Sequence, residues 1–344
     1  MRRRRKYLFC IVSLALIFLF SLFLSCISDF TTNVLEKQIP SYVVKPGKRY
    51  HVVFSDSVAA FYRSIPADSL IYVMLQPMFK PAAIIKADDF VGTRHKKWDT
   101  FLAFVAKKKL RVGLGLIANS LIYADDDAIK QLKSLNTFQF EFFLHGWDHR
   151  VEDNIAEFQG TSLREQIDHL QWSMDIIKNT LNYTPHTFGA PANRYDSLTT
   201  LALRQFPEIK IWFFGQPYSG LFILPHTVDA ESARGLVTDP DQFAFQYQHY
   251  KDQAAIVLEV HPQLWDESQY ERFQDIMLYL LKEGRRFVTP FGYFAWKEDK
   301  NKIRLSWTNK TAVIIDCTDC QYAHDLVFLF KPEDMYPIDI GIPD

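Results

Sequence analysis

Two histidines in the middle of the chain have a spacing that could place them on one metal ion. Residues 145–149 read His-Gly-Trp-Asp-His and directly follow the apolar residues 142–144. Imidazole nitrogens bind zinc at about 2 Å, so a shared ion favours a strand that turns sharply after His145 and brings His149 back. Gly146 permits such a turn because it lacks a Cβ atom. By itself this spacing is more typical of ordinary structure, and a metal site requires further ligands nearby.

Three further polar segments also follow short apolar runs. They are Asp88-Asp89, residues 188–194 (Phe-Gly-Ala-Pro-Ala-Asn-Arg) and residues 258–262 (Leu-Glu-Val-His-Pro). Carboxylates and imidazoles bind divalent metals and transfer protons in hydrolytic sites. Each segment alone fits a helix cap, a turn or a loop. Together, each at the end of a predicted strand, they indicate one site.

Short apolar runs alternate with helical segments between residues 82 and 295, which predicts βαβ units with parallel strands. About seven such units over roughly 200 residues favour a distorted (β/α) barrel over an open sheet, with functional groups beyond the carboxyl ends of the strands. The expected strands are residues 82–87, 110–117, 138–144, 209–214, 220–224, 254–260 and 286–288.

Two of the helices have recognisable starting signals. Ser162 and Glu165 form a capping box ahead of an apolar stripe that continues to Leu181. Ser268 and Glu271 form a second box, ahead of a helix that we expect to end near residue 284. These helices would follow the histidine segment and the segment 258–262 along the chain.

The order of the four polar segments resembles the polysaccharide deacetylase (NodB-homology, carbohydrate esterase family 4-like) superfamily, over roughly residues 82–295. The resemblance implies that Asp89, His145 and His149 bind a divalent metal, with Zn²⁺ the first choice. It further implies that Asp88 is the general base and His261 the general acid.

The chemistry implied by the resemblance is metal-dependent hydrolysis. Two imidazoles and one carboxylate leave open positions on zinc, which lowers the pKa of a bound water and polarises a carbonyl oxygen. The implied substrate is an N-acetylated glycan or polysaccharide that loses an N-acetyl (or O-acetyl) group.

The sequence departs from the family's pattern in two places. Residues 86–90 read Lys-Ala-Asp-Asp-Phe, where the family commonly has Thr-Phe-Asp-Asp-Gly. The segment with Pro191 lacks the arginine that commonly contacts the base, and Arg194 or Asn193 could substitute for it. Asp148 could compete with Asp89 as the carboxylate ligand. We expect substrate or supporting contacts from Pro191, Asn193, Arg194, Glu259 and Trp147.

Two other functions use the same residues. A glycosidase would use paired carboxylates, Asp88 or Asp89 with Glu259, about 5–9.5 Å apart, and would leave the histidine pair without a role. A membrane-anchored carbohydrate-binding pseudoenzyme would keep the barrel without catalysis. Exposed tryptophans can stack on sugars in either case, and the candidates are Trp147, Trp212 and Trp265.

The N-terminus predicts a single-pass membrane anchor. Basic residues 2–6 precede residues 7–27, which carry no charge and would extend about 31 Å as a helix, enough to cross a bilayer. The flanking charge places residues 1–6 in the cytoplasm and the catalytic domain outside it, on the periplasmic or extracellular face. A lipoprotein signal ending at Cys26 is the alternative.

The remaining organisation follows from composition and charge. Residues 28–50 read as a linker, 51–296 as the barrel, and 297–344 as a small β-rich appendage in which Cys317 and Cys320 could form a local disulfide. The 344 residues carry a formal net charge of -1, with both signs dispersed. This composition argues against a nucleic-acid-binding protein, which requires a basic face.

Overall fold

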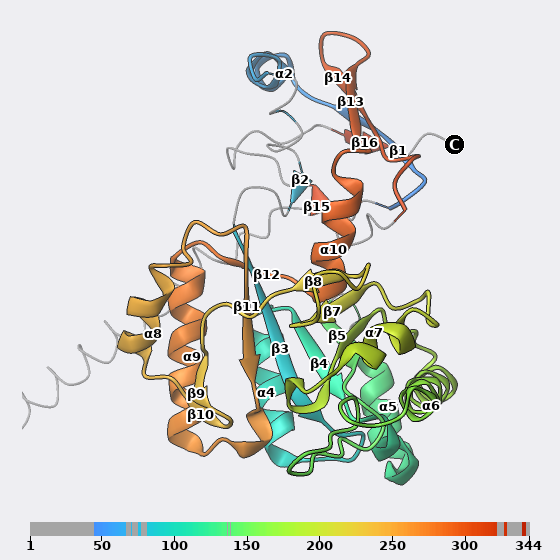
Figure 1. Ribbon diagram of the computed structural model, residues 1–344. Coiled ribbons are helices and arrows are strands. Elements are labelled where there is room, and N and C mark those ends of the chain that lie inside the picture. Colours follow the sequence, from blue (N-terminus) through green and yellow to red (C-terminus); the bar gives the residue numbers. More distant parts are fainter. Residues whose placement is uncertain are drawn as a thin grey trace, which may run out of the picture.

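The computed structural model describes residues 45–66, 70, 75–76, 81–135, 137, 139–321, 327–328 and 339–341 (Figure 1). The predicted membrane anchor, residues 7–27, and most of the predicted linker lie outside these ranges. Within them, every helix is too short or too polar to span a bilayer.

A curved parallel sheet forms the body of the molecule, and the expected α/β barrel of about seven strands is confirmed in its near-closed form (Figure 1). Its strand order is β11-β3-β4-β5-β6-β7-β8, and the short β12 also pairs with β3. The strands are β3 (Ala82–Phe90), β4 (Val112–Leu116), β5 (Phe140–Leu144), β6 (Thr187–Gly189), β7 (Ile211–Phe213), β8 (Phe222–Leu224), β11 (Ala255–Val260) and β12 (Arg286–Phe287).

One side chain bridges the seam between the two end strands, β8 and β11. The Thr227 hydroxyl donates to the carbonyl oxygen of Val257 at 3.0 Å and accepts from the amide nitrogen of the same residue at 2.8 Å. It therefore satisfies the backbone groups that a neighbouring strand would otherwise pair. The barrel is closed at this point by a hydroxyl group and not by a strand ladder.

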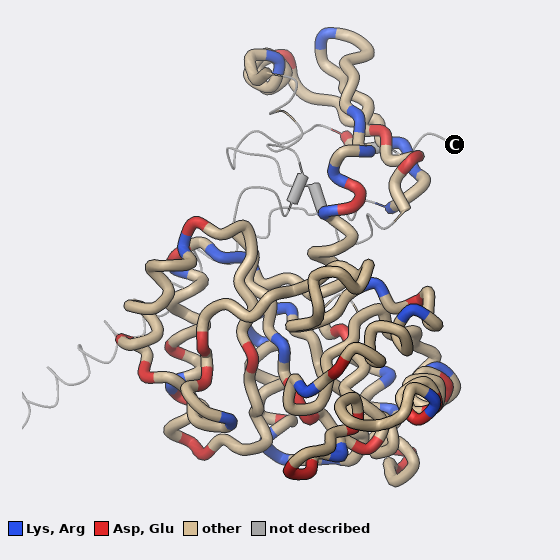
Figure 2. Tube along the Cα trace, in the orientation of Figure 1, with Lys and Arg blue, Asp and Glu red and all other residues tan. Residues whose placement is uncertain are grey.

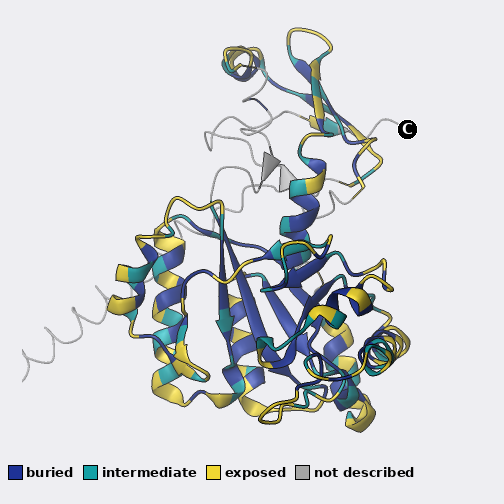
Figure 3. Ribbon diagram, viewed as in Figure 1, coloured by how far each residue is buried: buried dark blue, intermediate teal, exposed yellow. Residues whose placement is uncertain are grey.

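The barrel strands are largely buried (Figure 3), and strand alternation divides their side chains between two core clusters. On β3, Ala83, Ile85 and Ala87 pack outward against the helices, whereas Ala82 and Ile84 belong to the interior cluster. Because side chains alternate along a strand, the positions that continue the interior row are Lys86 and Asp88. The same parity on β5 and β11 directs His145 and Glu259 inward, beyond the interior residues Phe143 and Val257.

Helices cover the outer face of the barrel. They are α4 (Lys96–Lys107), α5 (Asp126–Ser134), α6 (Leu163–Leu181), α7 (Ser197–Leu203), α8 (Pro240–Tyr247) and α9 (Glu267–Lys282). The last helix, α10 (Pro290–Asp299), instead lies at the amino-terminal end of the barrel, where Phe294 packs in the interior cluster (Figure 1). Ser162 caps α6 as predicted, accepting from the amide of Glu165 at 3.2 Å. The predicted cap of α9 was wrong: Asp266, not Ser268, holds that position and accepts from the amide of Gln269.

A separate antiparallel sheet, of order β13-β14-β1-β16, forms the small β-rich lobe. It comprises β1 (Arg49–Val53), β13 (Arg304–Trp307), β14 (Ala312–Asp316) and β16 (Asp339–Gly341), accompanied by α2 (Asp56–Arg63). We predicted that the barrel begins at residue 51, but β1 pairs with β14 and β16 and so belongs to the lobe. The lobe lies beyond the amino-terminal ends of the barrel strands (Figure 1).

The two cysteines for which the sequence suggested a local disulfide both lie in the lobe, and no disulfide joins them. Cys317 and Cys320 are free thiols buried in the core of the lobe, and burial raises the pKa of Cys320 to about 11. Figure 2 shows basic and acidic residues interspersed along the trace. This mixture agrees with the prediction from composition.

A buried arginine ties the amino-terminal end of the barrel together. Arg285 is 2% exposed, and its guanidinium donates to the hydroxyl of Tyr247 and to four backbone carbonyls. These carbonyls belong to Ala82, Gln253, Tyr250 and Lys251, at 2.7–3.0 Å. The side chain thereby joins β3 to the loop that leads into β11.

We expect R285M to lower the free energy of unfolding by on the order of 3 kcal/mol, because it leaves several buried carbonyls without donors. Urea or thermal unfolding followed by circular dichroism measures the change. R304M is the matched control, since the Arg304 side chain is 74% exposed and its ion pair with Asp319 contributes about 0–1 kcal/mol. Equal losses in the two variants would contradict a structural role for Arg285.

Candidate functional site

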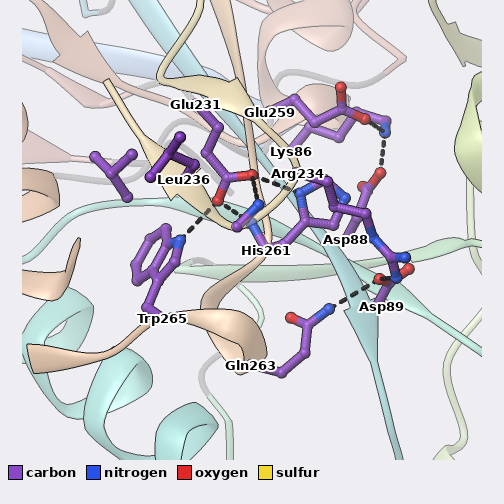
Figure 4. Close-up of polar contacts among 12 residues, drawn as sticks. Lys86, Asp88, Asp89, Glu231, Arg234, Leu236, Glu259, His261, Gln263 and Trp265 are labelled. Carbon is purple, nitrogen blue, oxygen red and sulfur yellow. Dashed lines mark hydrogen bonds and ion pairs between the residues drawn. The ribbon is translucent and has the colours of Figure 1, made fainter. Parts of the chain in front are cut away.

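The polar segments predicted from sequence meet at the carboxyl ends of the barrel strands, and Figure 4 shows the residues of β3 and β11 among them. Asp88 and Asp89 end β3, His145 follows β5, and His261 follows β11. A register shift between Ala87 and Phe90 interrupts the β3–β4 ladder, and Asp89 has a φ of 61°. This left-handed residue breaks the alternation of the strand, so both carboxylates face the same mouth of the barrel.

Asp89 lies between the two predicted histidine ligands. Its Oδ1 atom is 3.1 Å from Nε2 of His145 and 2.8 Å from Nε2 of His149. One ligand atom from each of the three residues lies within 4.8 Å of the others. Two imidazoles and a carboxylate are the donor set of many catalytic zinc sites.

The tautomer of His145 is consistent with a cation at this point. Its Nδ1 atom is 2.8 Å from the carbonyl oxygen of Gly189, which can only accept, so Nδ1 is the donor. In a neutral ring Nε2 is then an acceptor, and it faces another acceptor, Oδ1 of Asp89. Burial opposes a charged ring, but the carboxylates of Asp88 and Asp89 raise the pKa of His145 above its usual value. Either a proton or a metal ion resolves the contact, so the residues fit a divalent metal.

A buried glutamate shapes the loop that carries the histidines. The Glu157 carboxylate accepts hydrogen bonds from the backbone amides of Trp147 and His149, and it lies 3.0 Å from Nδ1 of His169. Gly146 has a φ of 82°, and a Cβ atom there would come within 2.3 Å of the Glu157 carboxylate. Both features make glycine necessary at this turn, as the sequence predicted. Glu157 itself belongs to none of the predicted segments.

The structure separates the two rival aspartates. Asp148 is exposed, accepts from the backbone amide of Arg150, and groups with Glu157 and His169. Asp89, in contrast, groups with His145 and His149. The geometry therefore favours Asp89 as the carboxylate of the candidate metal site.

The second oxygen of Asp89 has partners that the sequence did not predict. Arg234 and Gln263 both donate to Oδ2, and the Gln263 bond measures 2.8 Å. Arg234 lies in the turn between β9 (Glu231–Ala233) and β10 (Leu236–Val237), and 59% of its side chain is exposed. Burial would favour a neutral Asp89, but hydrogen bonds from His145 and His149 hold the pKa of Asp89 far below its usual range.

Asp88 lies beside this cluster with one oxygen occupied and one free. Its Oδ2 atom contacts Nζ of Lys86 and is 3.6 Å from Nε2 of His145. Its Oδ1 atom is buried and has no hydrogen-bond partner among the described residues. Burial raises the pKa of Asp88 to about 6, against the lowering effect of His145 and Lys86. A carboxylate of this kind can accept a proton near neutral pH.

His261 is oriented by a carboxylate from the β9–β10 hairpin (Figure 4). Glu231 accepts from Nδ1 of His261 at 2.7 Å, from its backbone amide at 2.8 Å, and from Nε1 of Trp265 at 2.7 Å. Burial alone would lower the pKa of His261, but Glu231 and the charge of Asp88 raise it above its usual value. The ring can therefore hold a proton for delivery from Nε2.

A cavity of about 350 Å³ is lined both by His149, from the candidate metal site, and by His261. Its lining includes a candidate metal ligand, the oriented histidine and side chains from the hairpin. The polar lining residues are His149, Asn193, His226, Asp229, Glu231, Arg234, Glu259 and His261.

The remaining predicted residues occupy supporting positions. Pro191 opens the short 3₁₀ turn Pro191–Asn193, and Asn193 donates to both oxygens of Glu259, at 2.9 and 3.1 Å. Arg194 instead contacts Gln159 and the carbonyls of the 152–153 loop. The expectation that Arg194 or Asn193 contacts Asp88 was therefore wrong, because Lys86 makes that contact.

Of the three tryptophans considered for sugar stacking, only Trp147 is partly exposed. It lies edge-to-face with the half-exposed Trp172, at a centroid distance of 5.6 Å. Trp212 and Trp265 are 0% and 3% exposed and pack within the core. These two side chains are not available to a sugar ring.

We expect D89N to lower zinc affinity by more than about 100-fold, because it removes the negative charge of a metal ligand. Loss of a group that only contacts a ligand lowers metal affinity by about 10–100-fold, and loss of the ligand charge itself should cost more. D148N is the matched control and should leave the affinity unchanged. Isothermal titration of each full-length variant with zinc measures the difference. A large loss in D148N with none in D89N would reverse the assignment.

Comparison with known proteins gives structural neighbours only. No family model matches the chain, and no curated protein matches it. A family 4 pseudoenzyme from Bacillus anthracis aligns at 14% identity and a TM-score of 0.44, over 62% of this chain and 64% of its own.

Two of the other neighbours are described by their activity. The family 4 acetyl xylan esterase of Clostridium thermocellum, in complex with cobalt, aligns at 14% identity and a TM-score of 0.46, over 63% of this chain and 91% of its own. The peptidoglycan deacetylase PdaC of Bacillus subtilis aligns at 14% identity and a TM-score of 0.45, over 65% and 94%. The structural neighbours of this chain are thus polysaccharide deacetylases and a pseudoenzyme of carbohydrate esterase family 4, at low sequence identity.

Proposed function

We propose that this protein is a metal-dependent hydrolase that removes acetyl groups from a carbohydrate. The observation that carries the proposal is the grouping of Asp89, His145 and His149 next to Asp88, with His261 lining the adjoining cavity. Metal ligands, a base and an acid are then present in one site. The carbohydrate part of the proposal rests on the motif order in the sequence.

Each residue has a distinct task in this proposal. Asp89, His145 and His149 would hold a divalent ion, most simply Zn²⁺, which supplies Lewis-acid activation of water and of the acetyl carbonyl. Asp88 accepts a proton from the attacking water through its free Oδ1 atom. The water oxygen bonds to the acetyl carbon, and the bond from that carbon to the sugar nitrogen or oxygen breaks.

His261 completes the reaction by protonating the departing group. Glu231 fixes Nδ1 as the donor to its own carboxylate, so Nε2 carries the transferable proton. The products are acetate and a sugar with a free amine or hydroxyl group. We further propose that residues 7–27 anchor the barrel outside the cytoplasm, as their charge and length predict.

Mass spectrometry of acetylated oligosaccharides incubated with the zinc-loaded protein tests this proposal. We expect a loss of about 42 Da for each acetyl group removed, with release of acetate. Chelation and H145A should both abolish the loss. A zinc-loaded protein that cleaves no acetyl group from N-acetylated or O-acetylated glycans would contradict the proposal.

A binding protein without activity is the second candidate, and one contact favours it. The Arg234 guanidinium already places a positive charge against the buried carboxylate of Asp89. Such a protein would bind glycans and release neither acetate nor new reducing ends. A glycosidase would release reducing ends and survive chelation, but Asp88 and Glu259 are both engaged by Lys86.

We expect E231Q to shift the alkaline limb of the pH–kcat profile to lower pH. Glu231 raises the pKa of His261, so its loss makes the ring give up its proton at a lower pH. E208Q is the control, because Glu208 is exposed and precedes β7, at the end of the barrel opposite the site. An unchanged alkaline limb in E231Q would exclude His261 as the titrating acid.

A further inference from the structure

A lysine lies at the bottom of the site, inside the barrel. Lys86 is 0% exposed and continues the interior row of β3 that begins with Ala82 and Ile84. Its stem passes Gly189, where a Cβ atom would come within 3.2 Å of the Lys86 Cε atom. The space for this long side chain thus depends on a glycine of β6, which lies across the barrel interior from β3.

The ammonium group is held by two carboxylates (Figure 4). Nζ of Lys86 contacts Oδ2 of Asp88 and lies 2.6 Å from Oε1 of Glu259. Glu259 is held in turn by the amide of Asn193. The ring of Phe214, whose centroid lies 5.1 Å from Nζ, covers the ammonium on another side.

These contacts leave the ammonium little freedom. An unpaired charge inside a protein costs several kcal/mol, so Nζ cannot leave both carboxylates without a large penalty. The contact to Oδ2 of Asp88 is therefore fixed by burial as well as by hydrogen bonding. It also determines which Asp88 oxygen remains without a partner among the described residues, namely Oδ1.

We propose that Lys86, braced by Glu259, is the positioning residue of the general base: it engages Oδ2 of Asp88 and thereby presents Oδ1 to the attacking water. The assignment rests on the proposed function. Lys86 is fully buried and is not among the residues that line the cavity, so its effect on the reaction would pass through Asp88. In this chain it makes the contact that the sequence led us to expect from Arg194 or Asn193.

Two variants test the assignment. K86M removes the ammonium but leaves two buried carboxylates side by side, which could prevent folding. K86M/E259Q removes both the ammonium and the charge that braces it, so that only Asp88 stays ionisable. K130M is the matched control, because the Lys130 side chain is 77% exposed on α5, outside the site.

Kinetics and zinc binding supply the first measurement. We expect K86M/E259Q to lower kcat on the order of 100-fold, as for a displaced general base, with an unchanged zinc stoichiometry. KM should stay within about twofold, because the loss is confined to the transition state. K130M should match the wild type. A folded K86M/E259Q variant with wild-type kcat would overturn the assignment.

A crystal structure of the zinc-loaded K86M/E259Q variant supplies a second measurement that does not depend on activity. We expect the Asp88 carboxylate to rotate or to occupy several orientations. A single, wild-type orientation would overturn the positioning role. If the wild-type protein binds zinc and releases no acetate, the proposed function fails, and this structural comparison still decides whether Lys86 orients the Asp88 carboxylate.

Discussion

Buried negative charge at the mouth of the barrel is the constraint that organises this site. Asp88, Asp89 and Glu259 lie at the ends of barrel strands, and Glu231 reaches the same mouth from the β9–β10 hairpin. A buried carboxylate is stable only when it is paired with donors or cations. Each is matched with donors or cations: Lys86 between Asp88 and Glu259, two imidazoles on Asp89, and His261 on Glu231. Removing any one partner therefore changes the charge balance of its neighbours.

The backbone places these groups by two local devices. Strand alternation directs Lys86, Asp88, His145 and Glu259 into the barrel, and the left-handed conformation of Asp89 turns one further carboxylate toward the same mouth. On the other side of the cluster, Glu157 holds the amides of the 147–149 loop. The ligand atoms are thus fixed by a strand end, a glycine turn and a buried carboxylate.

The barrel was predictable because its signals are local, whereas the grouping of Asp89 with His145 and His149 was an implication of the family resemblance. Short apolar strands, a capping box at Ser162 and polar residues at strand ends can all be read within a few residues of sequence. Four partners of the site were not predicted. Three of them, Glu231, Arg234 and Gln263, lie 30 to 174 residues along the chain from the residues they contact. The fourth, Lys86, stands in a strand whose sequence gives no sign of its contact with Asp88. The first strand of the lobe was misassigned for the same reason, since β1 pairs with strands more than 250 residues later.

The seam at Thr227 divides the site into two parts that tolerate changes of sequence to different degrees. The residues between β8 and β11 include the hairpin with Glu231 and Arg234. They lie at the seam, where the hydroxyl group of Thr227 takes the place of hydrogen bonds between two strands. Insertions or deletions there would leave the parallel hydrogen bonds of the barrel intact. The half that contains Asp89 and His145 is instead built on the paired strands β3 and β5. Related chains can therefore vary the hairpin beside His261, and with it the molecules they bind, while they keep Asp89, His145 and His149 in place.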